Sequence, residues 1–140
     1  MSRSGAGGRT LTAVVFMAGL LLEGLVADAP TLEQSARLMV GEALQIGGAG
    51  TSLTFVRVER DSRCPRGARC IRAGEAVVVF SLREDDGGVS TLTFEVPPGG
   101  GASQSFRGYR VQIIGLDPQA ETDVEIAPDD YVASIAVQKL

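Results

Sequence analysis

Two cysteines and a run of arginines are the residues of this chain whose type and spacing could do chemistry. Cys64 and Cys70 are its only cysteines, and the 140 residues include no histidine. Histidine is the usual general base near neutral pH and a frequent metal ligand, so its absence argues against many hydrolase and zinc sites. The spacing of the cysteines also differs from the C-x-x-C motif of thioredoxin-like redox sites. We therefore expect no catalytic residues, no metal site and no cofactor.

The close spacing of Cys64 and Cys70 favours a disulfide bond. Two cysteines near each other in an exported chain typically pair. The five residues between them include Pro65 and Gly67, which suit a tight turn. Closing so short a ring should stabilise the fold by only about 2 kcal/mol. The bond is therefore expected to fix the shape of a loop rather than to hold the whole domain together.

Arginine recurs at every third position through and around this cysteine loop. The six side chains are Arg57, Arg60, Arg63, Arg66, Arg69 and Arg72. Only two acids lie among them, so residues 57–72 carry a formal charge of +4. Guanidinium groups bind phosphates and carboxylates through paired N–H donors. The binding hypothesis is that an anionic lipid surface, an acidic glycan or an acidic protein is contacted by Arg63, Arg66, Arg69 and Arg72.

An acidic segment offers the alternative explanation of these arginines. Residues 117–130 hold six acidic side chains and no basic one, a formal charge of −6. The arginines would then be solvated or paired with nearby acids, including those of this segment, in surface pairs worth less than about 1 kcal/mol each. Asp61, together with Ser62, is expected to form an Asx- or ST-type turn that starts the loop. The net charge of the whole chain is −4, so we expect no nucleic-acid partner.

Two further functions stay open on the residues alone. A trypsin-like enzyme accepts arginine in an acidic specificity pocket, so the Cys64–Cys70 loop could act as a serine-protease inhibitor. Asp85-Asp86 and Asp129-Asp130 are paired carboxylates, the minimum for a calcium site or a glycosidase-type enzyme. Both pairs lie in expected turns, where aspartate is common for conformational reasons. We therefore favour a non-catalytic interaction module over both functions.

Residues 1–29 have the composition of an export signal. Two arginines precede an apolar run from residue 11 to residue 22, and Ala27-Asp28-Ala29 has the small-x-small pattern that signal peptidase reads. Because a proline follows Ala29 directly, cleavage after Ala27 is an alternative. An uncleaved inner-membrane anchor is another, because the apolar stretch is just short of a spanning helix. We expect a periplasmic or extracellular protein.

Residues 30–140 predict one all-β domain. Apart from a weak helical turn at 31–37, apolar and polar residues alternate in short segments separated by turn residues. Strands are expected at 38–46 with a bulge or bend at Gly41, at 53–60, 75–83 and 91–96, from 109 to the proline at 118, and at 131–137. A hairpin turn is expected at 85–88, a flexible loop at 97–101 and a polar connection at 120–130. About seven antiparallel strands with one apolar face each favour an antiparallel β-sandwich. The strand count suggests an immunoglobulin-like Greek key, and a small β-barrel is the alternative.

The segment Asp61-Ser62-Arg63-Cys64-Pro65, followed by Cys70 and Ala73-Gly74, resembles a family of small exported bacterial β-rich proteins. The family has no assigned biochemical activity. The resemblance supports export and the disulfide, and it names no site chemistry. The chain departs from the family at Arg72, where relatives tend to carry tryptophan, and it lacks the lipid-attachment cysteine of many relatives. A role that depends on an indole or on lipid tethering is therefore not expected here.

Overall fold

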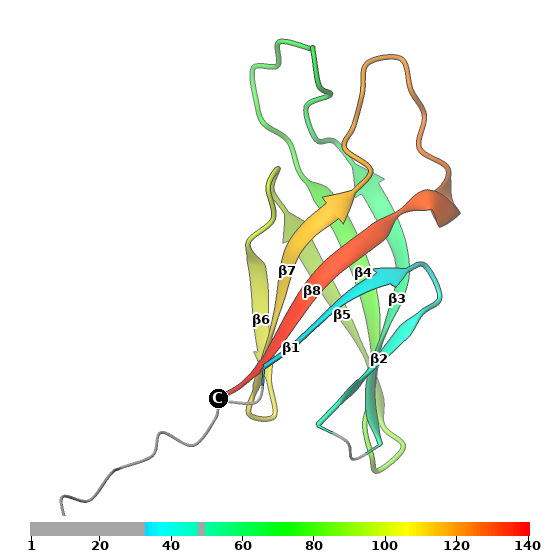
Figure 1. Cartoon of the computed structure of the whole chain (residues 1–140), viewed down its shortest axis with the longest axis vertical. Coiled ribbons are helices and arrows are strands. Elements are labelled where there is room, and N and C mark those ends of the chain that lie inside the picture. Colours follow the sequence, from blue (N-terminus) through cyan, green and yellow to red (C-terminus); the bar gives the residue numbers. More distant parts are fainter. Residues whose placement is uncertain (1–32, 48–49) are drawn as a thin grey trace, which may run out of the picture.

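Eight β-strands make up most of the computed structural model, which describes residues 33–47 and 50–140 (Figure 1). They are β1 (Glu33–Met39), β2 (Ala43–Ile46), β3 (Thr51–Asp61), β4 (Ala76–Arg83), β5 (Val89–Val96), β6 (Ala102–Phe106), β7 (Tyr109–Asp117) and β8 (Val132–Lys139). A single turn of 3-10 helix, η1 (Pro128–Asp130), precedes β8. The predicted export signal at residues 1–29 lies outside the described residues. Within those residues, none of the helical structure is long and apolar enough to cross a membrane.

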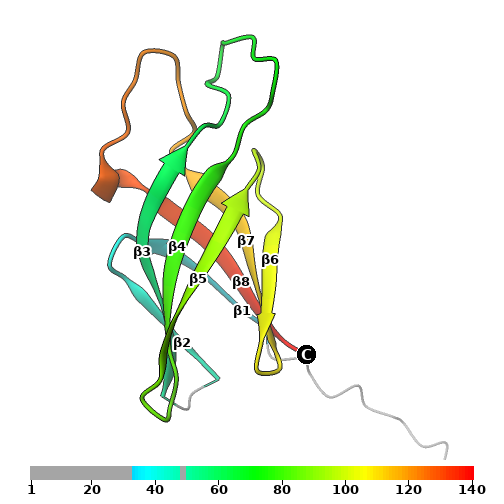
Figure 2. The same cartoon turned by 180° about the vertical axis from the view of Figure 1, so that it is seen from behind.

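The strands form two antiparallel sheets of four strands, which pack face to face as a sandwich (Figures 1 and 2). One sheet has the order β1-β8-β7-β6 and the other has the order β2-β3-β4-β5. Alternate residues of the inner strands point between the sheets, as their period-two pattern predicts. The largest side chains there are Phe55, Phe80 and Phe94, which contact one another at ring-centroid distances of 5.2 and 5.7 Å. The predicted all-β sandwich is confirmed, and the described strands do not close into a barrel.

Within each sheet, most neighbouring strands are consecutive in the chain. Consecutive strands are neighbours from β2 to β5 and again from β6 to β8, and β8 then pairs with β1. The immunoglobulin-like topology is therefore not confirmed by this arrangement.

Two local predictions were wrong. The weak helical turn at 31–37 is replaced from Glu33 onward by β1, which pairs with β8 from Glu33↔Gln138 to Met39↔Val132. Pairing with a neighbouring strand outweighs a weak local helical preference. The segment 38–46 is two strands rather than one, because the bend expected at Gly41, where φ is +90°, turns the chain from one sheet into the other.

Strand β3 is irregular in its pairing with β4. Its register against β4 shifts between Phe55 and Arg57, and again between Val58 and Arg60. A bulge adds a residue to one strand and so changes which side chains face the core. Phe55 is fully buried before the first shift, and Val58 packs against the same core after it. Apolar residues in both phases of the sequence pattern are thus accommodated.

Two long connections project from the same end of the sandwich (Figures 1 and 2). The first, here called the disulfide loop, comprises residues 62–75 between β3 and β4. The second, here called the acidic connection, comprises residues 118–131 between β7 and β8. The two are joined by an isolated parallel bridge between Arg66 and Glu121. The oppositely charged segments of the sequence therefore lie side by side.

Candidate functional site

Arg63, at the base of the disulfide loop, is buried. Its side chain is 8% exposed and donates from Nε and Nη2 to the two carboxylate oxygens of Asp61, at 2.8 and 2.7 Å. This fork-to-fork arrangement is the strongest geometry available to an arginine and a carboxylate. The same guanidinium donates to the carbonyl of Leu116 at 2.8 Å and to that of Pro118 at 2.9 Å. Arg63 therefore ties the disulfide loop to the end of β7.

Because its donors are engaged inside the protein, Arg63 is not available to a partner, which corrects its place in the binding hypothesis. The Asx turn that we expected at Asp61 is confirmed, since the Arg63 backbone N–H donates to Asp61 Oδ1 at 3.2 Å. The Tyr131 hydroxyl donates to Asp61 Oδ2 at 3.0 Å. One carboxylate thus organises the ends of three strands, β3, β7 and β8.

The contacts among Asp61, Arg63 and Tyr131 shift the pKa values of all three side chains. Burial alone raises the pKa of Asp61, but hydrogen bonds from Arg63 and Tyr131 outweigh it and hold that pKa below its ordinary value. The hydrogen bond to Asp61 raises the pKa of Arg63. Burial, and then the hydrogen bond to Asp61, raise the pKa of Tyr131 to about 12. Tyr131 is therefore a hydrogen-bond donor throughout the physiological pH range.

The raised pKa of Tyr131 predicts a loss of stability at alkaline pH. A group whose pKa is higher in the folded protein contributes stability that is complete below its unfolded pKa and is lost as pH rises through the folded one. For Tyr131 this interval runs from its ordinary value of 10.0 to about 12. We expect Tyr131→Phe to flatten the decline of the unfolding free energy across this interval, as measured by urea titration. Equal slopes in Tyr131→Phe and the wild-type protein would contradict the assignment.

The two halves of the D-S-R-C-P…C…A-G segment face each other across the base of the disulfide loop. The Ser62 N–H donates to the Glu75 carbonyl and the Cys64 N–H to the Ala73 carbonyl, both at 2.8 Å. These bonds continue the β3–β4 ladder beyond the strands. The predicted disulfide joins Cys64 to Cys70, with a Cα–Cα distance of 5.9 Å. The loop therefore has a paired base and a covalently closed ring above it.

The remaining arginines divide into a paired group and an exposed group. Arg57 and Arg60 lie near Glu59 and Glu75, at N–O distances of 4.0 and 3.2 Å. The others are exposed, and within the part of the chain that the structure describes no carboxylate lies within 4.0 Å of them. With a fully exposed isoleucine between two of them, they form what is here called the basic tip: Arg66, Arg69, Ile71 and Arg72.

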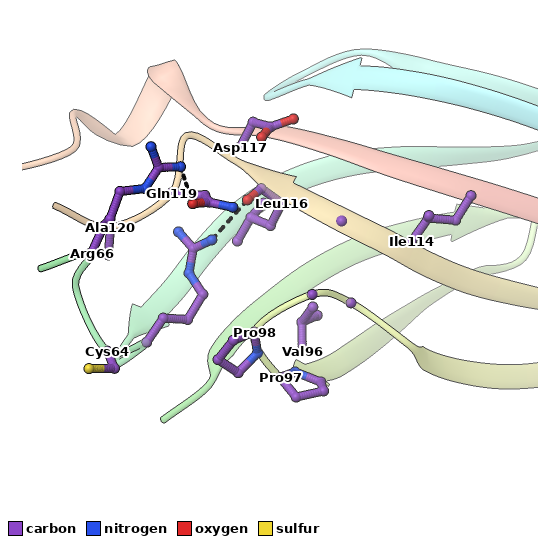
Figure 3. Close-up of a pocket in the computed structure, with 14 residues that line it drawn as sticks. Cys64, Arg66, Val96, Pro97, Pro98, Ile114, Leu116, Asp117, Gln119 and Ala120 are labelled. Carbon is purple, nitrogen blue, oxygen red and sulfur yellow. Dashed lines mark hydrogen bonds between the residues drawn. The ribbon is translucent and has the colours of Figure 1, made fainter. Parts of the chain in front are cut away.

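Contact between the basic tip and the acidic connection is made by backbone and neutral groups. The Arg66 N–H donates to the Ala120 carbonyl at 2.7 Å, and the Thr122 hydroxyl donates to the Arg66 carbonyl at 3.2 Å. The Arg66 guanidinium donates to the side-chain oxygen of Gln119 (Figure 3). Among the described residues, no cation lies within 4.0 Å of the connection's exposed carboxylates, which belong to Glu121, Asp123, Glu125, Asp129 and Asp130. The expected pairing therefore holds for Arg57 and Arg60, and the two neighbouring loops do not neutralise each other.

A cavity of about 310 Å³ lies beside the basic tip (Figure 3). Val96 and Leu116 line it with apolar side chains, and residues 97–100 form another part of its wall. The close approach of this segment to β7 requires Gly100, because a Cβ there would lie 1.9 Å from the Ile114 carbonyl oxygen. Sequence reasoning missed the cavity, because its walls come from segments far apart in the chain. The glycine-rich stretch 97–101 was the one local signal of a close backbone approach.

The geometry of the cysteine ring disfavours a protease inhibitor. An inhibitor offers its scissile segment in an extended and accessible conformation, whereas the Ala68 N–H donates to the Pro65 carbonyl at 3.1 Å and closes a turn. Arg66 also uses both backbone groups to contact the acidic connection. The backbone of the ring is thus engaged in contacts within the protein and is not presented as an extended segment.

The paired carboxylates lie in turns at opposite ends of the molecule. Asp86 accepts the Gly88 N–H at 2.8 Å in the predicted hairpin turn between β4 and β5. Asp129 and Asp130 form the 3-10 turn before β8. Across residues 33–47 and 50–140, no three His, Cys, Asp or Glu side chains gather as a metal site would require. The two pairs therefore do not combine into one candidate site.

Comparisons with protein-family models, with curated proteins and with solved structures found no match for this chain. A functional proposal therefore depends on the geometry above. Its most distinctive element is the basic tip, which three features hold in place: a disulfide, the Arg63 network and the bridge to the acidic connection.

Proposed function

We propose that this protein is an exported, non-catalytic interaction module that contacts an anionic partner through Arg66, Arg69 and Arg72. The observation that carries the proposal is that these three guanidinium groups are exposed and have no carboxylate within 4.0 Å in the described chain. An arginine already paired inside the protein offers little to a partner. An arginine without such a pair keeps its planar N–H donors for phosphate or carboxylate oxygens.

The support beneath the basic tip favours binding over simple solvation. The Cys64–Cys70 disulfide closes the ring, and Arg63 fixes its base to the Leu116 and Pro118 carbonyls. A loop that is already ordered loses less conformational entropy when it binds. Only the exposed side chains then need to become ordered on contact.

Export is proposed on two features of the chain. Disulfides persist in oxidising compartments and are rare in the cytosol, and this protein carries one between its only cysteines. The first 29 residues also have the charge and hydropathy of an export signal. The proposed location is the periplasm or the extracellular space.

Titration with hexaglutamate tests the proposal, because this probe supplies closely spaced carboxylates and is short enough to contact one loop. We expect the oxidised protein to bind it, more weakly as salt is added. Replacing Arg66, Arg69 and Arg72 together by alanine should raise the dissociation constant about tenfold, since three exposed charge contacts of about 0.5 kcal/mol each amount to a factor of that size.

The matched control for this titration is Arg83→Ala/Arg110→Ala. Both side chains are exposed and lie toward the other end of the sandwich. This control should bind hexaglutamate with nearly the wild-type dissociation constant. If the wild type does not bind, or if the control loses as much affinity as the tip variant, the basic tip is not the binding surface.

A further inference from the structure

The end of the molecule that carries the basic tip presents both signs of charge. Three exposed arginines lie on one loop and five exposed acids on the loop beside it, and the bridge between Arg66 and Glu121 keeps the loops adjacent. A broad anionic surface that approached the arginines would also meet the acids. Repulsion would then oppose much of the attraction. The arrangement favours a partner that presents its own acidic and basic segments in the complementary order.

We infer that this partner is a second copy of the same chain, an inference that rests on the proposed binding role of the basic tip. A two-fold axis passing between the loops would place the basic tip of each copy over the acidic connection of the other. The same surface patch is then used twice, as in the isologous interfaces of most homodimers. Each of the two contacts pairs arginines with carboxylates that have no cation within 4.0 Å among the described residues of one copy.

Each loop also exposes one apolar side chain that such a dimer would cover. Ile71 is fully exposed between Arg69 and Arg72, and Val124 is 57% exposed between Asp123 and Glu125. A single exposed apolar residue is ordinary on a protein surface. Here Ile71 lies among basic residues and Val124 among acidic ones. A two-fold contact between the oppositely charged segments would therefore remove both side chains from water. Because the loops are small, we expect a weak dimer whose dissociation constant rises with salt.

Charge reversal tests the inference. Sedimentation velocity of the oxidised protein should show a monomer–dimer equilibrium. The protein concentration should reach about 1 mM, because small interfaces give weak dimers. Arg69→Glu/Arg72→Glu should raise the dissociation constant at least about tenfold, because attractive contacts become repulsive. Glu121→Arg/Glu125→Arg should do the same from the other side, and it leaves Asp123, whose φ is +61°, unchanged. All four positions are exposed, so the far-ultraviolet circular dichroism and melting temperature should stay near those of the wild type.

The decisive measurement is sedimentation of a mixture of the two charge-reversed variants. In the mixture each reversed tip faces a reversed connection, so dimers of one copy of each variant should form although neither variant dimerises alone. A wild type that stays monomeric up to about 1 mM at low salt would overturn the inference. So would a mixture that stays monomeric, or wild-type binding to phosphatidylglycerol vesicles without dimerisation. In each case the hexaglutamate titration still decides separately whether the basic tip binds anions at all.

Discussion

Arg63→Ala is expected to destabilise the domain by about 3 kcal/mol, the low end of the cost of breaking a buried ion pair. The loss leaves Asp61, which is 11% exposed, without its charge partner. It also leaves the Leu116 and Pro118 carbonyls without the donor that they share. Urea unfolding at neutral pH measures the change in unfolding free energy.

Arg60→Ala is the matched control for this variant. Arg60 pairs with Glu75 at 3.2 Å, but its side chain is exposed, so its loss should cost less than about 1 kcal/mol. If Arg63→Ala and Arg60→Ala were equally stable, the buried network would not be the element that anchors the disulfide loop.

Gly74→Ala should destabilise the domain by at least about 3 kcal/mol, because two penalties combine at this position. Gly74 has a φ of +69°, a conformation that residues with a side chain adopt only with strain. A Cβ there would also lie 1.8 Å from the Ser62 carbonyl oxygen, so the backbone of one strand extension would have to move.

Gly67→Ala separates these two penalties. Gly67 has a φ of +84°, and a Cβ there would meet no atom within 4 Å. Its replacement should therefore cost only about 1–2 kcal/mol for the backbone conformation. Thermal and urea unfolding of both variants measure the difference, and a Gly67→Ala variant as unstable as Gly74→Ala would contradict the role of the close approach at Ser62.

Most of the sandwich could be predicted because its strands carry a period-two pattern that burial between two sheets requires. Ala76, Val78, Phe80 and Leu82 alternate in the sequence and are all buried in β4. Strand β6 was missed because its residues, Ala-Ser-Gln-Ser-Phe, are small or polar and show no apolar alternation. Strand β6 forms because it pairs with β7, and the residues of β6 alone do not indicate this pairing.

The candidate site was predictable in its chemistry but not in the roles of its individual arginines. Spacing at every third residue made Arg63 and Arg66 look equivalent, whereas folding buries one and exposes the other. The signal that separates them was the Asp61-x-Arg63 spacing, since an aspartate that forms an Asx turn is placed to receive the arginine two residues on. The distant acceptors, the Leu116 and Pro118 carbonyls, could be found only from the fold.

The measurement that most directly tests the basic tip as a contact surface is an amide chemical-shift map of the oxidised, ¹⁵N-labelled protein titrated with hexaglutamate. The largest shifts should fall on residues 66–72, with smaller ones on residues 119–122, whose backbone and side chains contact Arg66. Arg83 and Arg110, which are also exposed on this domain, should hardly shift. Shifts spread evenly over all exposed arginines, or centred on Arg83 and Arg110, would contradict the assignment of the tip.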